Sequence, residues 1–344
     1  MRVGSAVRLW HIACSVLLLV SGAQGALAGT TYGTNGPTNV NTNSQTTYQA
    51  TDTTTGLLND RIDQATGTTI SSRPAVDLGG GKAAGSEPRN FGLWANVGNT
   101  WIRNSQPGVE MHGPIFSTLV GLDYSWQPWL LTGVAGGYER VDIYTGFNNG
   151  NQASNGAIFA SYAAIRLSPN FSLDGQVGHA WIGYNGSHGG VSSAFTGDRW
   201  FGSANVKAKT TIDAWQLVGS IGYFYVAETQ GSYTESNGNV VPSSMPYLGQ
   251  VRVKGEVGYR FEMQFGALTP FASARLEFDT QHGEAPVINS AGQRAAVSEF
   301  GTTFGAGLKA DLGDYTSLIL EGKTTQFRQY FEAYGVNASL RIRF

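Results

Sequence analysis

Three kinds of feature are scarce in this chain of 344 residues. It has a single cysteine, Cys14, so no disulfide can form within it. Charged residues make up only 13% of the chain and the formal net charge is −2, which argues against a nucleic-acid-binding protein. No run of about 18 apolar residues occurs, so any membrane span has to be built from strands.

Glycine and the aromatic residues are abundant instead. Glycine accounts for 47 residues, roughly twice the usual share. Aromatic residues make up 12% of the chain, and tyrosine and tryptophan suit positions between an apolar phase and water. No metal-binding signature, phosphate-binding loop or nucleophile elbow is visible, so we expect no cofactor and no catalytic centre.

The N-terminus is typical of an export signal. Arg2 and Arg8 are basic, the segment 9–20 is a short apolar core, and Ala26 and Ala28 offer small residues for cleavage before Gly29. The apolar core is too short to cross a bilayer as a helix. We therefore predict a signal peptide over residues 1–28, whose removal also removes the cysteine.

Residues 29–88 are predicted to be a short and mostly disordered passenger or linker. Up to residue 55 they are rich in Thr, Asn and Gln, with almost no large apolar side chains to pack. Leu57, Leu58 and Ile62 share one face at helical spacing, which predicts a short helix near 56–66. Such a helix is marginal alone in water and needs a wall to pack against.

The C-terminal segment 334–344 has the period of a strand. Its apolar face is formed by Tyr334, Val336, Ala338, Leu340, Ile342 and Phe344, and its polar face includes Arg341 and Arg343. An amphipathic edge strand of a soluble sandwich would show the same alternation. Lipid on one side and a wet lumen on the other explains it as well.

Repetition favours the membrane interpretation. From residue 89 onward, strand-like segments of about ten residues or more follow one another. They cover 91–103, 114–126, 130–144, 156–167, 171–184, 200–211, 215–227, 250–262, 268–279, 300–312, 315–325 and 334–344. Short turns alternate with connections that we expect to be longer, such as 186–198. We predict an all-β fold: a transmembrane antiparallel barrel of about twelve strands over residues 89–344, with the short helix in its lumen.

The polar faces of the later strands supply the candidate functional residues. If the apolar faces meet lipid, the alternate charged side chains point into the lumen, where mixed signs hold water and grip a threaded segment. These residues are Arg252, Lys254, Glu256, Arg260, Arg275, Glu277, Lys309, Glu321, Lys323, Arg341 and Arg343.

Several motifs in this order resemble the translocator β-domain of autotransporters, the barrel of type V secretion. They are the segments 120–124 (VGLDY), 133–138 (GVAGGY), 256–261 (EVGYRF) and 268–271 (LTPF), followed by the terminal Phe344. The resemblance covers 91–344 and implies a twelve-stranded barrel in a Gram-negative outer membrane, with a helix through the lumen. It also implies that Tyr334, Val336, Leu340, Ile342 and Phe344 form the signal read by the barrel assembly machinery.

The expected function is therefore that of an outer-membrane autotransporter barrel, anchored as a monomer, whose short N-terminal segment crosses or plugs the lumen. Its partners would be the lipid bilayer and the secretion and assembly machineries, and not nucleic acid. One alternative is a porin-like or structural barrel, whose conductance would not change when residues 30–88 are deleted. A further alternative is a barrel hydrolase with His179 or His188 and Asp198 at the rim.

Overall fold

The computed structural model of the chain describes residues 37–66, 90–264, 266–283, 285–287, 294–313 and 316–343. All of them belong to one compact unit, Thr31–Phe344. The predicted signal peptide with Ala26 and Ala28, most of the linker after residue 66, and Phe344 lie outside the described residues. Arg343 is described by its backbone only.

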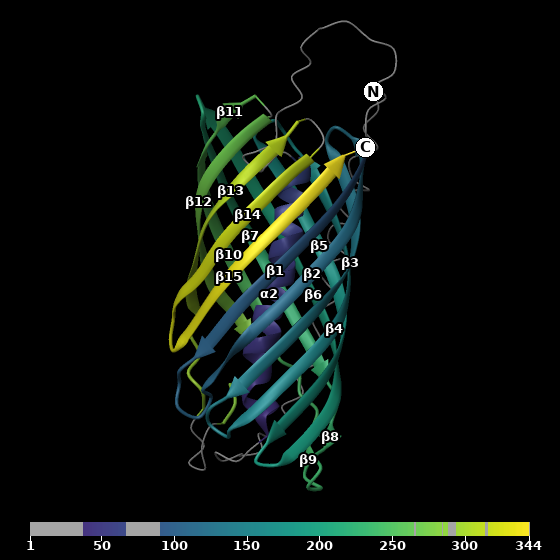
Figure 1. Cartoon of the computed structure of the whole chain (residues 1–344), viewed down its shortest axis with the longest axis vertical. Coiled ribbons are helices and arrows are strands. Elements are labelled where there is room, and N and C mark those ends of the chain that lie inside the picture. Colours follow the sequence, from purple (N-terminus) through teal and green to yellow (C-terminus); the bar gives the residue numbers. More distant parts are fainter. Residues whose placement is uncertain are drawn as a thin grey trace, which may run out of the picture. The chain divides into compact units, whose positions relative to one another are not determined.

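The strands form one antiparallel sheet that closes on itself (Figure 1). Its members, in chain order, are β1 (Phe91–Asn104), β2 (Met111–Gln127), β3 (Leu130–Thr145), β4 (Gly150–Arg166), β5 (Phe171–His188), β6 (Val191–Ile212), β7 (Trp215–Gln230), β10 (Tyr247–Tyr259), β11 (Phe261–Met263), β12 (Gly266–His282), β13 (Phe300–Leu312), β14 (Thr316–Arg328) and β15 (Phe331–Arg343). Only Arg260 separates β10 from β11, and both pair with β12. β10 and β11 therefore act as one strand of the ring, so the ring has twelve strands, as predicted.

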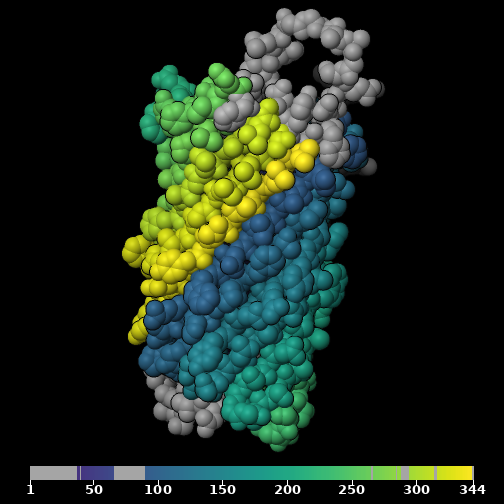
Figure 2. Space-filling model, viewed as in Figure 1, coloured from purple at the N-terminus to yellow at the C-terminus, as the bar shows by residue number. Residues whose placement is uncertain are grey.

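The first and last strands close the ring. β15 pairs antiparallel with β1 along its whole length, from Phe331 opposite Asn104 to Arg343 opposite Gly92. Figure 2 shows the two strands side by side on the surface, the N-terminal strand in blue and the C-terminal strand in yellow. Closure leaves no row of unpaired backbone groups, which hydrocarbon would not tolerate.

The two ends of the barrel differ in their connections. At one end, here named the turn end, short turns join β2 to β3, β4 to β5, β6 to β7, β11 to β12 and β13 to β14. At the other end, named the loop end, lie the longer connections between β1 and β2, β7 and β10, and β12 and β13, together with short turns from β3 to β4, β5 to β6 and β14 to β15, where longer connections were expected. The connection from β7 to β10 carries a small hairpin of β8 (Tyr233–Thr234) and β9 (Val240–Val241).

One predicted loop is wrong. The segment 186–198 is not a loop, because β5 continues to His188 and β6 begins at Val191. The two strands are joined by Gly189 and Gly190, whose φ angles of 51° and 82° lie in the left-handed region that a tight hairpin turn requires. The outward residues of β6 there are Ser192, Ala194, Thr196 and Asp198, so the apolar face that marks a strand in the sequence is absent.

The helix is also longer than predicted. Helix α2 spans Thr38–Thr66, 29 residues, so residues 38–55 are helical and not disordered. No helix in the described part of the chain is long and apolar enough to span a membrane. Threonine is a poor helix former in water, but inside the barrel its hydroxyl can bond to the carbonyl one turn back, as Thr51 does to Thr47 at 2.7 Å and Thr55 to Thr51 at 2.8 Å. Hydrogen-bond partners on the barrel wall stabilise the other polar side chains of the helix.

Some of the glycines are explained by aromatic rings that lie against neighbouring strands inside the barrel. A Cβ atom on Gly121 would lie 2.3 Å from the Trp94 ring, and one on Gly133 would lie 2.2 Å from the Tyr162 ring. The Trp94 indole nitrogen donates to the Tyr162 hydroxyl at 2.8 Å. Glycine at these two positions therefore makes room for a connected pair of rings in the lumen.

Candidate functional site

The lumen is the candidate functional site, and α2 runs lengthwise through it (Figure 1). The first turn of α2 is held at the loop end. Thr38 Oγ1 donates to the Ser187 carbonyl at 3.1 Å, and Asn41 Nδ2 donates to the Gly108 carbonyl at 3.1 Å. The N-terminal end of the helix is therefore fixed among the loop-end connections.

The last turn of α2 is held at the turn end. Gln64 Nε2 donates to Ser339 Oγ at 2.9 Å, and a guanidinium nitrogen of Arg341 donates to the Gln64 carbonyl at 2.8 Å. Arg341 thereby binds a free carbonyl at the helix C-terminus, where a cation is electrostatically favoured. The direction of α2 is thus set by contacts at both ends.

The helix does not sit in the centre of the barrel but leans on one side. Its apolar residues Leu57, Leu58 and Ile62 are fully buried in one cluster with wall residues that include Trp94 and Leu119. We name strands β1 to β7 the packed wall. No Cα atom of α2 comes within 8 Å of a Cα atom of β12, β13 or β14. We name these three strands, together with β10, the open wall.

Ion pairs on the packed wall are almost completely removed from water. Arg61 of α2 binds Asp123 of β2 through its Nε at 2.7 Å, with side chains 0% and 2% exposed. Arg199 of β6 lies between Glu139 at 2.9 Å and Glu228 at 2.7 Å, and all three side chains are at most 2% exposed. These charges are compensated by partners and not by solvent.

Some charges on the open wall keep contact with solvent, whereas Glu277, Lys309 and Glu321 of the same wall are buried. Asp52 of α2 bridges Arg252 of β10 and Arg275 of β12 at 2.8 Å each, and the three side chains are 20%, 11% and 17% exposed. Lys254 and Lys323 are 28% and 23% exposed. The helix therefore meets the open wall through ion pairs that are partly exposed.

The predicted lumen residues occupy the following places. Glu256 binds Lys254 at 3.0 Å and also Lys309, while Glu277 binds Arg275 at 2.6 Å. Lys323 lies between Glu321 at 2.9 Å and Asp60 of α2 at 3.7 Å. Arg260 is at the turn end with Asp311 and Glu262, and the Arg343 side chain is outside the described residues.

Comparison with known proteins supports what the geometry indicates. The family model described as the autotransporter beta-domain matches residues 93–322. The chain belongs to the autotransporter β-domain family. It is an outer-membrane barrel of the translocator type, and α2 lies in its lumen. Comparison with the curated proteins finds no match.

Three solved autotransporter domains have a similar fold. The translocator domain of NalP from Neisseria meningitidis is 11% identical with a TM-score of 0.65, covering 89% of this chain and 99% of that one. The beta domain of the Bordetella autotransporter BrkA is 17% identical with a TM-score of 0.61, covering 74% and 100%. The transport unit of AIDA-I from Escherichia coli is 10% identical with a TM-score of 0.54, covering 82% and 96%.

Several residues that form ion pairs in the lumen of this autotransporter barrel were not predicted. On the packed wall they are Asp123, Glu139, Asp174, Arg199, Lys207 and Glu228, and on α2 they are Asp52, Asp60, Arg61 and Asp63. The wall residues lie on the inward faces of their strands, but on β3 that face also carries Leu131, Val141 and Ile143, so alternation alone does not signal Glu139. Asp52 lies in the part of α2 that was not expected to be helical, whereas Asp60, Arg61 and Asp63 lie in the predicted helix near 56–66 but were not assigned wall partners.

The outer surface of β15 carries the predicted assembly signal. Tyr334, Val336, Leu340 and Ile342 are 41% to 65% exposed on the outside of the barrel. Asn337, Ser339 and Arg341, on the other face of the same strand, are buried in the lumen. These four side chains therefore project outward from β15, the strand that closes the ring by pairing with β1.

The two histidines considered for a rim hydrolase are not brought together. His179 lies on the outer face of β5 between the rings of Trp181 and Trp200, with Asp198 at 3.8 Å. His188 is buried and bonds to Glu235 at 2.9 Å. In the described residues, no group of three or more His, Cys, Asp or Glu side chains could hold a metal ion.

Proposed function

We propose that this barrel exports its own N-terminal segment and that α2 remains in the lumen as a plug. The direction of α2 carries the proposal. Thr38 and Asn41 bind the loop end, and Gln64 binds Ser339 at the turn end. Short turns of outer-membrane barrels face the periplasm and the longer loops face outside, so a segment that precedes α2 is attached at the outer mouth.

The same arrangement divides the chain into three segments. Residues 1–28 act as the signal peptide, cleaved after Ala28, and residues 29–88 form the short passenger and the linker that include α2. Residues 89–344 form the barrel. The function is physical rather than catalytic: the polar lumen lets an extended segment pass, and the last part of that segment then folds against the wall.

Assembly of the barrel supplies a second part of the proposal. Tyr334, Val336, Leu340 and Ile342 project from the last strand toward the outside, and with Phe344 they form the signal read by the barrel assembly machinery. The barrel then functions as a monomer, because its ring is closed by its own first and last strands. Removing Phe344 is expected to lower the amount of assembled barrel in cells without changing refolding in detergent.

Export is tested by protease treatment of intact cells with an epitope tag inserted after Gly33. We expect the tag to be digested. One control carries the tag between Asp213 and Ala214, in the turn between β6 and β7, and should be protected. A second control carries it after Asn237, in the loop-end hairpin region, and should be digested. Protection of the Gly33 tag in cells where both controls behave as expected would contradict export.

A further inference from the structure

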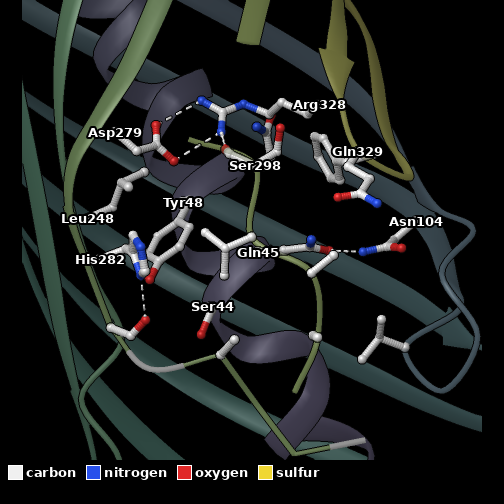
Figure 3. A pocket seen from close by; sticks show the side chains of 18 of the residues that line it. Ser44, Gln45, Tyr48, Asn104, Leu248, Asp279, His282, Ser298, Arg328 and Gln329 are labelled. Carbon is white, nitrogen blue, oxygen red and sulfur yellow. Dashed lines mark hydrogen bonds and ion pairs between the residues drawn. The ribbon is translucent and has the colours of Figure 1, made fainter. Parts of the chain in front are cut away.

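Cavities lie on both faces of β10 and β12. On the lumen face, a cavity of about 120 Å³ lies between Gln45 and Tyr48 of α2 and wall residues that include Leu248 and Arg328 (Figure 3). Its charged side chains already bind each other, as Arg328 binds Asp279 at 3.0 Å. The larger cavity is on the other face of these strands, toward the lipid.

This lipid-facing cavity is an apolar groove across β6, β7, β10 and β12. Its volume of about 860 Å³ is within the range of about 300–1,000 Å³ that small-molecule sites occupy. A Cβ atom on Gly219 or on Gly255 would meet no atom within 4 Å. The floor of the groove is a row of small residues that pair across the four strands: Ala208, Gly219, Gly255 and Ala274.

Larger apolar side chains surround this floor. Phe171 of β5 and Phe304 of β13 stand at its two ends, because they pair with Ala208 and with Ala274. Along its sides lie exposed residues of the neighbouring rows: Val206, Leu217, Ile221, Val253, Val257 and Leu276. Outward apolar residues of an outer-membrane barrel meet hydrocarbon, so the groove opens toward lipid and not toward the lumen.

The floor of the groove has the length and direction of a lipid chain. From Ala208 to Ala274 it spans three strand spacings, or about 14 Å, and the chains of one leaflet fill about half of a hydrocarbon core about 30 Å thick. The floor crosses strands that are tilted by about 35–45°, so it is tilted by roughly 45–55° from the membrane normal. A transmembrane helix, tilted by about 20° on average, would cross the groove, whereas a flexible acyl chain can follow it.

The end of the groove beside β5 is polar and lies at the turn end. It is lined by Asn170 of the turn between β4 and β5, and by Lys209 and Thr210 near the end of β6. Arg166 is near enough to Lys209 for the two positive charges to act on each other. An anionic headgroup at this edge of the bilayer therefore meets positive charge while its chain enters the groove.

We propose that the groove holds an acyl chain of an anionic phospholipid from the turn-end leaflet, with the phosphate beside Lys209. The bound chain supports β12 from the outside, where α2 gives no support from the lumen, since no Cα atom of the helix comes within 8 Å of one of β12. This inference depends on the outer surface of the barrel and not on export of the N-terminal segment.

The test is native mass spectrometry of the full-length barrel taken from vesicles with equal parts of palmitoyl-oleoyl phosphatidylglycerol and phosphatidylethanolamine. We expect phosphatidylglycerol to stay bound to the wild-type barrel. Gly219→Leu and Gly255→Leu fill the floor of the groove and should lower the bound fraction severalfold. Leucine suits a lipid-facing strand position better than glycine does, so both variants are expected to fold.

Gly136→Leu is the matched control. Gly136 lies on the outer face of β3 between Val120 and Phe159, which are both exposed to lipid. Its Cβ atom would meet nothing closer than the Ile158 carbonyl oxygen at 3.9 Å, and it is outside the groove. This variant should bind phosphatidylglycerol as the wild type does.

Lys209→Gln tests the place of the headgroup. Because the floor of the groove is unchanged, this variant should still bind lipid but should lose the preference for phosphatidylglycerol over phosphatidylethanolamine. Each variant is first shown to be folded by its faster migration in unheated SDS gels.

Four outcomes would overturn the proposal. A folded wild-type barrel without bound phospholipid is the first, and a Gly136→Leu barrel that loses as much lipid as Gly219→Leu is the second. In the third, Lys209→Gln keeps the preference for phosphatidylglycerol, so the phosphate is not at the turn end. In the fourth, the wild type is a dimer and Gly255→Leu a monomer, which would assign the groove to a second copy of the chain.

Discussion

The packed wall and the open wall of this barrel hold the same helix in different ways. On the packed wall, Leu57, Leu58 and Ile62 of α2 are fully buried and Arg61 is enclosed with Asp123. On the open wall, Asp52 and Asp60 of the same helix reach arginine and lysine side chains that remain partly hydrated. One side of the plug is therefore fixed by apolar contact and dry ion pairs, and the other by ion pairs whose side chains are partly exposed.

The difference shows how a polar helix can be both anchored and removable from a pore. A dry ion pair does little for net stability when compared with an apolar pair, but losing one partner leaves a buried charge and is expensive. Hydrated pairs cost little to form or to break. The packed wall thus fixes the position of α2, while the open wall gives it a compatible surface without closing the lumen.

The largest expected effect is on the packed wall at Arg199. Changing Arg199 to Met leaves Glu139 and Glu228 buried without their shared cation, which should lower the free energy of unfolding by about 3–5 kcal/mol. The measurement is urea unfolding of the detergent-solubilised barrel, followed by tryptophan fluorescence.

A triple variant separates charge from shape at this site. Arg199→Met combined with Glu139→Gln and Glu228→Gln removes the uncompensated charges while keeping similar volumes, so it should regain most of the lost stability. If the triple variant is no more stable than the single one, the penalty comes from packing and not from buried charge.

An intermediate effect is expected for the apolar contact of the plug. Ile62→Ala removes buried methylene and methyl groups next to the packed wall and should destabilise the docked helix by about 2–5 kcal/mol. Hydrogen exchange of the α2 amides measures this loss. Gln49 is half-buried and lines cavities between α2 and the open wall, so Gln49→Ala should lower the protection of the α2 amides far less. Equal effects of the two variants would mean that the two walls hold α2 equally.

The barrel itself was predictable because each face of a strand meets one kind of environment. Lipid outside and polar groups inside impose a strict period of two, so Val251 and Val253 on one face and Arg252 and Lys254 on the other mark β10. The prediction failed where that contrast ends. In the first half of β6, the outward residues are Ser192, Ala194, Thr196 and Asp198, which lack an apolar signal.

The N-terminal half of α2 could not be predicted, because its stability comes from the wall. Thr47 donates to Glu228 at 3.0 Å and Tyr48 donates to the Tyr247 carbonyl at 2.8 Å, and both acceptors are about 180 or more residues away in the chain. Local propensity contains no information about such partners.

The candidate site was half predicted for a similar reason. Charges on the open wall are dense at alternate positions, as at Arg252, Lys254 and Glu256, so the sequence displays them as a group. On the packed wall the inward charges are sparser: Asp123 is the charged residue of β2, and on the inward face of β6 neutral residues separate Arg199 from Lys207. The register between strands and the position of α2 bring these charges into pairs and triads. Neither can be read from the sequence of a single segment.

The smallest expected effect comes from Asp60, which stands next to Arg61 on α2 but faces the other wall. Asp60 lies 3.7 Å from Lys323, which keeps Glu321 as a closer partner at 2.9 Å. Asp60→Asn should therefore change the unfolding free energy by less than about 1 kcal/mol, whereas Arg61→Met leaves Asp123 buried and should cost about 3–5 kcal/mol. Urea unfolding of the two variants under identical conditions compares the walls at adjacent residues. Similar losses would mean that solvent does not screen the open wall.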